Sequence, residues 1–561
     1  MRLRGPVGFG VLAALICASP AFAVPKVVPL GGDTTADADP VAACGSLAAS
    51  PWQDGWKGRG LDDKAIFLDG ALTACEQALK ASPDSAQVKA WLARVYLLVG
   101  RSGDAEPLLD AAANDGDALG AYLLSKAIDT PAIGYDNADS RSVTLLKQSS
   151  DAGFVPAMND LAARFETANG VDQDPAEALR LYRLAADQGS GLAIYKLGEL
   201  SLNGTGVTQD FVQAAEFYQQ AADAGEPLGY NGLGRLYQYG QGEPQDYGKA
   251  AEAFQKGADQ GEPQSETDLA YLYDQSLGLT KDPGKSFALL ADAAGQGYGF
   301  GQAALAIHYL YGEGVDADPR QALDLASAAE QKHVLYAEGI VGYMYAEGLG
   351  TDRDLSVAEG YFQTGSDGGD KYSSDRLAIT KLEIACEDVA GSQYEPGGTG
   401  HGIDYEAIDP GTAIEACQTA LNANPNSVGD KVWLGRAYAA AGQYQDAVPL
   451  LRAGLDANNA LAQVTYAHLL LDGKGMDADA AGAVELYQAA AEKDFPLAQY
   501  ALGAIYAGGI GVQADLDAAR QWYGKALDNG IEEARTQLAA LQTTAAPPID
   551  LTGFGREGPA Y

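Results

Sequence analysis

Basic residues are scarce in this chain. Its 561 residues include 37 Lys and Arg against 76 Asp and Glu, which gives a formal net charge of -39. A polyanion of this strength repels nucleic acid and anionic lipid headgroups, so we expect neither as a partner. We interpret the acidity as a means of keeping a long exposed chain soluble. Attraction of a basic partner protein, or of loosely held divalent cations, is the alternative.

Long apolar runs are also lacking. No stretch approaches the roughly 18 apolar residues that a membrane span requires. The N-terminus carries Arg2 and Arg4, a short apolar stretch over residues 7–18 and a small-residue ending at Ala23. These are features of a secretory signal peptide, with an uncleaved N-terminal helix as the alternative. We therefore expect residues 1–23 to be removed and the protein to be secreted, with the periplasm as its expected location.

Cysteine is rare as well. The chain has five cysteines, of which Cys17 lies in the expected signal peptide, and the other four form two pairs at the same spacing of 31 residues. In an oxidising compartment we expect Cys44 to bond to Cys75 and Cys386 to Cys417, each bond contributing about 3 to 4 kcal/mol in the chain-entropy model. A redox or zinc role is the alternative, but C-x-x-C is absent and the four histidines are scattered.

Sequence signatures of catalysis are missing. Gly284-Lys285-Ser286 is similar to the end of a phosphate-binding loop, but Leu279 stands where that motif needs a glycine. We therefore interpret Lys285 as part of a helix start. His401 lies in a glycine-rich segment that has no serine or cysteine nucleophile signature.

Acidic turns are present, but they lack the glycine and the terminal glutamate of a calcium loop. They precede expected helices, where aspartate caps the first turn, so we interpret them as capping residues. These residues include Asp316, Asp318, Asp477 and Asp479. We predict no catalytic residue, no metal ligand and no cofactor.

A strict internal period dominates what the chain does contain. A glycine returns every 36 residues, mostly with a leucine nine residues before it and an alanine eight residues after it. Such a period is typical of a solenoid, in which each repeat buries its apolar face against the next. The glycines are Gly134, Gly170, Gly206, Gly242, Gly278, Gly314 and Gly350, and the same step of 36 residues separates Gly475 from Gly511.

Within each unit, apolar residues fall at helical spacings of three and four, and a glycine stands where the first helix must end and the chain must turn. This pattern indicates two antiparallel helices per repeat. The predicted fold class is all-α, a right-handed α-solenoid of antiparallel helix pairs.

One unit shows the whole pattern: Leu197-Gly198, Gly204-Thr205-Gly206-Val207, Ala214, Tyr218, Ala221-Ala222 and Gly225. It resembles the Sel1-like repeat, a relative of the tetratricopeptide repeat. Seven such units span residues 118–369 and two more span 459–530. Single units are degenerate, since His333 replaces the closing glycine of one of them.

A second duplication lies outside this array, with two copies offset by a constant 342 residues. The second copy also resembles an ordinary tetratricopeptide repeat. Each half of the chain therefore opens with a cysteine-bearing module and continues into Sel1-like repeats. Corresponding residues include Cys44 and Cys386, Cys75 and Cys417, Trp91 and Trp433, and Arg94 and Arg436.

The predicted domain organisation follows from these two duplications. It comprises a signal peptide over 1–23, a disordered linker over 24–40, a cysteine-bearing tetratricopeptide-like module over 41–117, seven Sel1-like repeats over 118–369, a linker helix with the second cysteine-bearing module over 370–458, two Sel1-like repeats over 459–530, a capping helix over 531–542 and a disordered tail over 543–561.

The resemblance implies a protein-protein interaction scaffold or adaptor, which regulates or assembles components of a cell envelope, such as the outer domain of a sensor or a polysaccharide-export complex. Its expected partners are proteins or peptides, basic ones among them. The alternative is an enzyme of β-lactamase-like or other hydrolase type. Relatives with that association carry a cysteine pair in nearly every repeat, and the Sel1-like units here have none. The oligomeric state is not predicted.

A binding groove can be placed by register. If the helices stack as in tetratricopeptide proteins, the first helix of each repeat lines the concave face. Positions two residues before and after its key leucine then point into the groove. Aromatic and adaptable polar side chains there suit peptide recognition, and ordinary inter-repeat packing is the alternative. The predicted groove residues are Tyr195, Glu199, Asn231, Arg235, Thr267, Tyr271, Ile307 and Tyr343.

Overall fold

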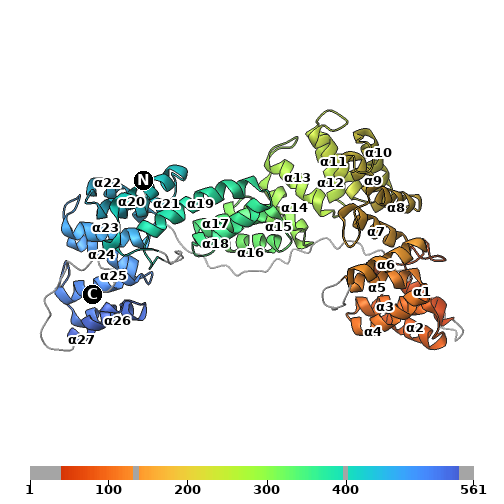
Figure 1. Ribbon diagram of the computed structural model, residues 1–561, viewed down its shortest axis with the longest axis horizontal. Coiled ribbons are helices and arrows are strands. Elements are labelled where there is room, and N and C mark those ends of the chain that lie inside the picture. Colours follow the sequence, from red (N-terminus) through yellow and green to blue (C-terminus); the bar gives the residue numbers. More distant parts are fainter. Residues whose placement is uncertain (1–38, 58, 130–137, 396–401, 542–561) are drawn as a thin grey trace, which may run out of the picture. The chain divides into compact units, whose positions relative to one another are not determined.

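A computed structural model describes residues 39–57, 59–129, 138–395 and 402–541. Within these ranges the chain forms 27 α-helices and two short 3₁₀ helices, with no β-strand (Figure 1). The expected all-α solenoid of helix pairs is therefore confirmed.

Some predicted features lie outside the described residues. They are the signal peptide, nearly all of the linker over 24–40, the tail over 543–561, Gly134 and His401.

The chain divides into two compact units, residues 1–185 and 186–561. In the first unit, α1 packs on α2, α3 on α4 and α5 on α6, and a 3₁₀ turn over Asp63–Ala65 separates α1 from α2. The helices are α1 (Pro40–Ala48), α2 (Leu68–Ala81), α3 (Ala86–Leu98), α4 (Ser102–Asn114), α5 (Ala118–Ile128), α6 (Ala138–Asp151) and α7 (Val155–Thr167), with α8 (Pro175–Asp187) at the boundary.

The second unit continues the pairing. In its first part, the first helices of repeats, α9, α11, α13, α15 and α17, each contact the next one along the chain, and each packs on its own second helix. The helices are α9 (Gly191–Asn203), α10 (Phe211–Asp223), α11 (Leu228–Tyr239), α12 (Tyr247–Ala258), α13 (Pro263–Asp274), α14 (Pro283–Gly295), α15 (Gly299–Tyr311), α16 (Pro319–Glu330), α17 (Leu335–Glu347) and α18 (Leu355–Asp367).

A longer helix, α19, joins this array to the second cysteine-bearing module, and two more helix pairs and a short last helix follow the module. The helices are α19 (Lys371–Ala390), α20 (Pro410–Ala423), α21 (Val428–Ala440), α22 (Tyr444–Asp456), α23 (Ala460–Asp472), α24 (Ala480–Ala491), α25 (Pro496–Gly508), α26 (Leu516–Asp528) and α27 (Glu533–Ala540), with a 3₁₀ turn over Tyr405–Ala407.

Glycine and aspartate set the helix ends. Gly204 ends α9 in the left-handed region at φ 71°, which a residue without Cβ adopts at little cost. Asp318 caps α16, where its carboxylate accepts hydrogen bonds at 3.1 Å from the backbone N–H groups of Arg320 and Gln321. Asp479 caps α24 in the same way. The backbone N–H of Lys285 donates to Asp282 at the start of α14, so this lysine belongs to a helix start.

Each repeat is held together where its two helices approach closely. A Cβ added to Gly234 on α11 would lie 2.4 Å from the ring of Phe254 on α12. The same relation joins Gly198 to Tyr218, Gly342 to Phe362 and Gly503 to Tyr523. Where alanine takes the glycine position, the opposing residue is smaller, as in the pairs Ala270 with Leu290 and Ala306 with Ala326. Ala162 and Ala467 depart from this relation, since Tyr182 and Tyr487 stand in their repeats.

This contact makes a stability prediction with an internal control. Gly234→Ala should lower the melting temperature, because overpacking against Phe254 costs about 1 to 3 kcal/mol. Gly360→Ala in α18 should raise it slightly, because nothing lies within 4 Å of its added Cβ and alanine favours a helix by about 1 kcal/mol. Thermal unfolding followed by circular dichroism measures both. Equal shifts in the two variants would contradict the close-approach explanation.

The two cysteine-bearing modules have the same covalent cross-link. Disulfides join Cys44 to Cys75 and Cys386 to Cys417 with S–S distances of 2.04 and 2.00 Å, and these are the pairs that the spacing predicts. All four cysteines are fully buried. Each bond ties a helix that precedes a loop to the helix that follows that loop.

The modules also share a buried tryptophan contact. The Trp91 Nε1–H donates to Gln53 Oε1 at 2.8 Å, and the Trp433 Nε1–H donates to Glu395 Oε2 at 2.8 Å. The second copy therefore has a carboxylate where the first has an amide. Burial raises the pKa of Glu395, and the Trp433 hydrogen bond opposes this effect.

A second buried acid distinguishes the copies. Asp430 on α21 stands where the first copy has Val88, and both residues are fully buried. Neither carboxylate oxygen of Asp430 has a hydrogen-bond partner in the described part of the chain. Burial, and then the charge of Glu383, raise the pKa of Asp430 to about 7, although Arg353 opposes them. The folded second module therefore favours the neutral acid.

The stability of this module should depend on pH. Because the folded pKa of Asp430 lies above the unfolded value near 3.9, its stabilising contribution is complete below pH 4 and is lost as the pH rises to about 7. Asp430→Asn should therefore stabilise the protein by up to about 4 kcal/mol at pH 8 and have little effect at pH 4. Melting temperatures across this range test it. Asp446→Asn, an exposed change in the same module, is the control, and a gain that does not vary with pH would contradict the prediction.

Candidate binding pocket

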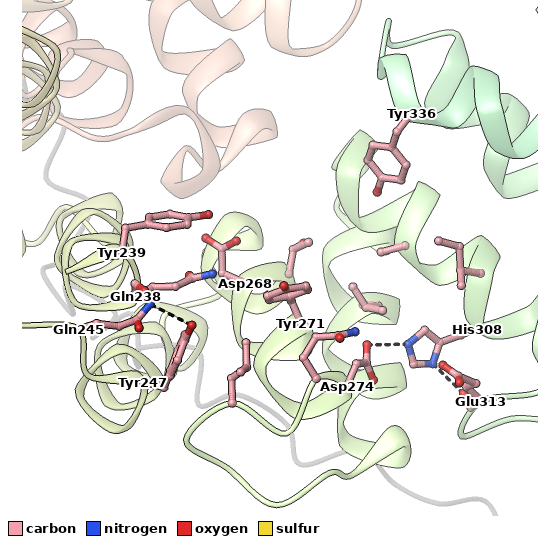
Figure 2. A pocket seen from close by; sticks show the side chains of 16 residues that line it. Gln238, Tyr239, Gln245, Tyr247, Asp268, Tyr271, Asp274, His308, Glu313 and Tyr336 are labelled. Atoms are coloured by element: carbon pink, nitrogen blue, oxygen red, sulfur yellow. Dashed lines mark hydrogen bonds and ion pairs between the residues drawn. The ribbon is translucent and has the colours of Figure 1, made fainter. Parts of the chain in front are cut away.

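A pocket of about 590 Å³ lies along the first helices of four successive repeats (Figure 2). Side chains from α11, α13, α15 and α17 form most of its lining, together with residues of the turns after α11, α13 and α15, Tyr247 of α12 and Leu290 of α14. Its 16 lining residues include Asp268, Asp274 and Glu313 but no lysine or arginine. The pocket is therefore an acidic site on the surface formed by the first helices.

Tyr239 and Asp268 form one end of the pocket, and Tyr271 lies between this end and Asp274 (Figure 2). Figure 2 places Tyr239 and Asp268 at this end, away from His308 and Glu313. Tyr239, the last residue of α11, is 61% exposed, and Tyr271 on α13 is 48% exposed. Aromatic faces next to a carboxylate attract cations, through the ring quadrupole and through charge.

A hydrogen bond from a buried asparagine holds Asp268 in place. The fully buried Asn231 on α11 donates its Nδ2–H to Asp268 Oδ2 at 2.8 Å. Burial raises the pKa of Asp268, whereas the hydrogen bond from Asn231 and the charge of Arg235 act in the opposite direction. A cationic ligand side chain would favour the ionised form in the same way.

Asp274, His308 and Glu313 form the other end, and the buried Ser286 lies behind them. His308 on α15 is almost fully buried, and its Nδ1 lies 2.7 Å from the backbone oxygen of Glu313. Its Nε2 lies 3.1 Å from Asp274 Oδ2 and 3.2 Å from Ser286 Oγ, and the Ser286 hydroxyl donates to the same Asp274 oxygen at 2.7 Å. Burial lowers the pKa of His308, but the hydrogen bonds with Asp274 and the Glu313 carbonyl outweigh it, so the pKa is raised.

This arrangement differs from that of a serine hydrolase. In a catalytic triad, the serine faces one imidazole nitrogen and the carboxylate orients the other. Here Ser286 and Asp274 both face Nε2, and a backbone carbonyl occupies Nδ1. Ser286 is also fully buried, so its hydroxyl does not reach the pocket surface.

The structure brings three of the eight predicted groove residues together. Thr267, Tyr271 and Ile307 line the pocket. Tyr343 on α17 lies outside the pocket lining, half-buried, with the Arg376 guanidinium 5.7 Å from its ring centre.

The other four predicted residues pack between repeats. Tyr195 and Asn231 are buried, and the ring of Tyr195 lies 5.6 Å from that of Tyr218. Tyr218 donates its hydroxyl hydrogen to Glu199, and the charges of Glu199 and Asp268 raise the pKa of Arg235, although burial lowers it. These side chains contact neighbouring helices and lie outside the lining of this pocket.

Several pocket residues were not predicted from the sequence. They include Tyr239, Tyr247, Asp268, Asp274, His308, Glu313 and Tyr336. Tyr239 ends α11 and Glu313 lies in the turn after α15, at positions that the repeat pattern does not constrain. The sequence could have indicated His308, because it is a polar residue at a position that is apolar in most repeats. The groove prediction did not use this observation.

Comparison with known proteins identifies the repeats. The Sel1 repeat model matches residues 155–190, 191–226, 227–262, 263–298, 299–333, 336–370, 456–495 and 496–531, just over half of the chain. The chain belongs to the Sel1 repeat family. A tetratricopeptide repeat model also matches residues 68–127. The helix pair α5 and α6, which the sequence predicts as the first Sel1-like unit, lies outside the Sel1 matches.

Solved structures of Sel1 repeat proteins are similar to this one. An Escherichia coli protein, c5321, described as a protective antigen of uropathogenic strains, is 25% identical, with 78% of this chain and 90% of that chain covered at a TM-score of 0.40. A Sel1 repeat protein from Oxalobacter formigenes is 26% identical, with 41% and 94% covered at a TM-score of 0.37. No curated protein matches the chain.

Two properties of this Sel1 repeat protein bear on its partners. Sel1 and tetratricopeptide repeats generally mediate contacts between proteins. Among the described residues, no helix is long and apolar enough to cross a membrane.

The support beneath Asp268 can be tested in this Sel1 repeat protein. Asn231→Ala should lower stability by about 1 to 3 kcal/mol, because it removes a buried side chain and the hydrogen bond that it donates to the half-buried Asp268 carboxylate. Asn203→Ala, at an exposed position on α9, should change stability by less than about 0.5 kcal/mol. Urea unfolding of both variants measures the difference. Equal costs would show that the Asn231 hydrogen bond adds nothing to the fold.

Proposed function

We propose that this Sel1 repeat protein is a non-catalytic interaction scaffold that binds an extended segment of a partner protein. A lysine or arginine of that segment enters the pocket on α11, α13, α15 and α17. The observation that carries this proposal is the combination of exposed Tyr239 and Tyr271 with Asp268 in a pocket without basic side chains other than His308.

The size and chemistry of the pocket suit such a ligand. A volume of about 590 Å³ lies in the range of ligand pockets, and it accommodates one long side chain with its neighbouring backbone. A guanidinium or ammonium group gains from the tyrosine faces and from the Asp268 carboxylate at once. The chain charge of -39 would also speed the approach of a basic partner.

We place this interaction outside the cytoplasm. Two buried disulfides are typical of oxidising compartments, and the first 23 residues have the composition of a secretory signal. The proposed partners are therefore envelope proteins. The hydrolase alternative gains no support from the Ser286, His308 and Asp274 cluster, because its hydrogen bonds do not follow the order of a catalytic triad.

A peptide array tests the proposal. Peptides of about 12 residues are incubated with the purified mature chain, and the bound peptides are identified. Peptides with a lysine or arginine beside apolar residues should be retained, and their acidic counterparts should not. Binding should weaken as the salt concentration rises, because the attraction involves partly exposed charges. Tyr239→Ala combined with Tyr271→Ala should reduce retention by at least about tenfold, the effect of losing roughly 1.4 kcal/mol.

Matched variants separate the pocket from the rest of the acidic surface. Tyr311→Ala removes a tyrosine that is 60% exposed but lies outside the pocket lining, and it should bind like the wild type. Asp268→Asn should weaken binding, whereas Asp324→Asn, which removes an exposed charge on α16, should not. If the tyrosine double variant keeps the same peptides as the wild type, the pocket is not the binding site.

A further inference from the structure

Near the pocket, three polar residues stand at repeat positions that hold apolar residues in most units of this part of the chain. His308 stands where the other repeats of the second unit have apolar residues, namely Leu200, Leu236, Leu272, Met344, Leu469 and Ile505. Ser286 stands where alanine recurs, at Ala178, Ala214, Ala250, Ala322, Ala358, Ala483 and Ala519. Asp274 corresponds to Leu202, Gln238, Leu310 and Ala346 in the second unit and to Glu166 on α7.

These polar side chains converge on one point although they come from three helices. Asp274 ends α13, Ser286 lies on α14 and His308 lies on α15. The mutual distances of Asp274 Oδ2, Ser286 Oγ and His308 Nε2 are 2.7 to 3.2 Å. Within the second unit, positions that otherwise pack alanine against apolar residues here hold a histidine, a carboxylate and a hydroxyl in contact. The equivalent positions of the first unit hold Arg164 and Ser142, which also contact each other. Unlike the arginine, His308 offers a ring nitrogen that can bind a ligand.

The cluster also has the composition of a metal site. Asp274, His308 and Glu313 each offer one ligand atom, and these atoms lie within 4.8 Å of one another. In the described part of the chain, this is the one group of three such residues. Ligands of Zn²⁺ sit about 2.0 to 2.2 Å from the ion, so the three side chains would have to move closer together to share one ion.

The surroundings of His308 match those of a ligating histidine. A metal-bound imidazole usually donates its other N–H to a carbonyl or carboxylate, which fixes the ring and the tautomer. His308 Nδ1 lies 2.7 Å from the Glu313 carbonyl, which leaves Nε2 directed at Asp274. Asp274 Oδ1 is buried without a hydrogen-bond partner among the described residues, so this carboxylate has coordinating capacity left.

We propose that Asp274, His308 and Glu313 bind a divalent transition metal, with Zn²⁺ as the best match. A histidine with two carboxylates favours such an ion over Ca²⁺ and Mg²⁺, which prefer oxygen ligands alone. All three residues line the pocket, so the remaining coordination position faces it and is filled by water or a ligand group. The Ser286 hydroxyl orients Asp274 from the core side.

This site is independent of the proposed peptide binding. Tyr239 and Asp268 provide cation contacts at one end of the pocket, His308 and Glu313 lie at the other, and Tyr271 lies between them (Figure 2). Bound metal would join α13 to the Gly312–Gly314 turn after α15. It would therefore stiffen the junction of two neighbouring repeats.

Measurement of zinc binding tests the proposal. The mature full chain is first treated with a chelator to remove metal and is then dialysed. Equilibrium dialysis with ZnCl₂ should show one saturable site that a large excess of CaCl₂ or MgCl₂ does not displace. Zn²⁺ should also raise the melting temperature. His308→Leu should weaken binding by at least about tenfold and abolish the thermal shift. It installs the residue found in several other repeats, so we expect it to fold.

Two further variants keep the test decisive. Glu313→Gln changes a partly buried turn residue to the one that Gln241 supplies in another repeat, and it should also weaken zinc binding. His333→Asn is the control, because His333 is exposed at φ 59° and Asn458 has the equivalent position at φ 57°. It should bind zinc like the wild type.

Three results would overturn the metal site. They are the absence of a saturable zinc site in the wild type, equal zinc binding by His308→Leu and the wild type, and displacement by Ca²⁺, which would indicate diffuse binding to acidic surface groups. Tyr239→Ala with Tyr271→Ala should retain zinc, so the failure of peptide binding and the failure of the metal site are distinguishable.

Discussion

The close approach of the two helices within a repeat is the contact on which the rest of the structure depends. Gly234 against Phe254 and Gly503 against Tyr523 show how tight it is, because even one added carbon would collide with a ring. A single helix pair cannot bury its apolar face, so each pair must stack on the next. An insertion within a helix would disturb the contact on both sides of it. The constant step of 36 residues is the sequence record of this constraint.

The same constraint decides where the protein can vary. Core positions are committed to packing, whereas turn residues and the exposed side of each first helix are not. Tyr239, Tyr271 and Glu313 stand at positions that packing does not constrain. The stacking of α11, α13 and α15 places them around one pocket. The buried cluster of Ser286 and His308 is different, since it takes positions that packing normally reserves for apolar residues. Polar residues at these buried positions would lower stability unless their polar atoms were hydrogen-bonded. In the structure, Ser286 and His308 lie within hydrogen-bonding distance of each other.

The two cysteine-bearing modules share the same main contacts but differ in two buried side chains. Disulfide, tryptophan and arginine contacts recur in both copies; Arg94 donates to Ala48 O and Arg436 donates to Ala390 O. The second copy, however, exchanges Gln53 for Glu395 and Val88 for Asp430, and both acids are held where burial raises their pKa. Duplication thus preserved the shape of the module while making the second copy sensitive to protonation.

Much of the fold could be predicted from the sequence, and the candidate site only in part. The period, the helix pairs, the capping aspartates and the cysteine spacing are local or repeated features, so they can be recognised in the chain alone. The groove prediction placed Thr267, Tyr271 and Ile307 on the pocket, but it also included Tyr195 and Asn231, which are buried between repeats. A register rule treats all repeats alike, whereas the side-chain volumes of each neighbour decide which positions stay exposed.

The sequence by itself determined that this is a stack of Sel1-like helix pairs with two cross-linked modules, because identical repeats must bury identical faces and so leave a period. Only the tertiary structure decided which residues meet. Asp274, Ser286, His308 and Glu313 come from different helices and one turn, and their contact depends on how neighbouring repeats pack against each other. Packing of that kind is the sum of many side-chain contacts, and no spacing along the chain encodes it.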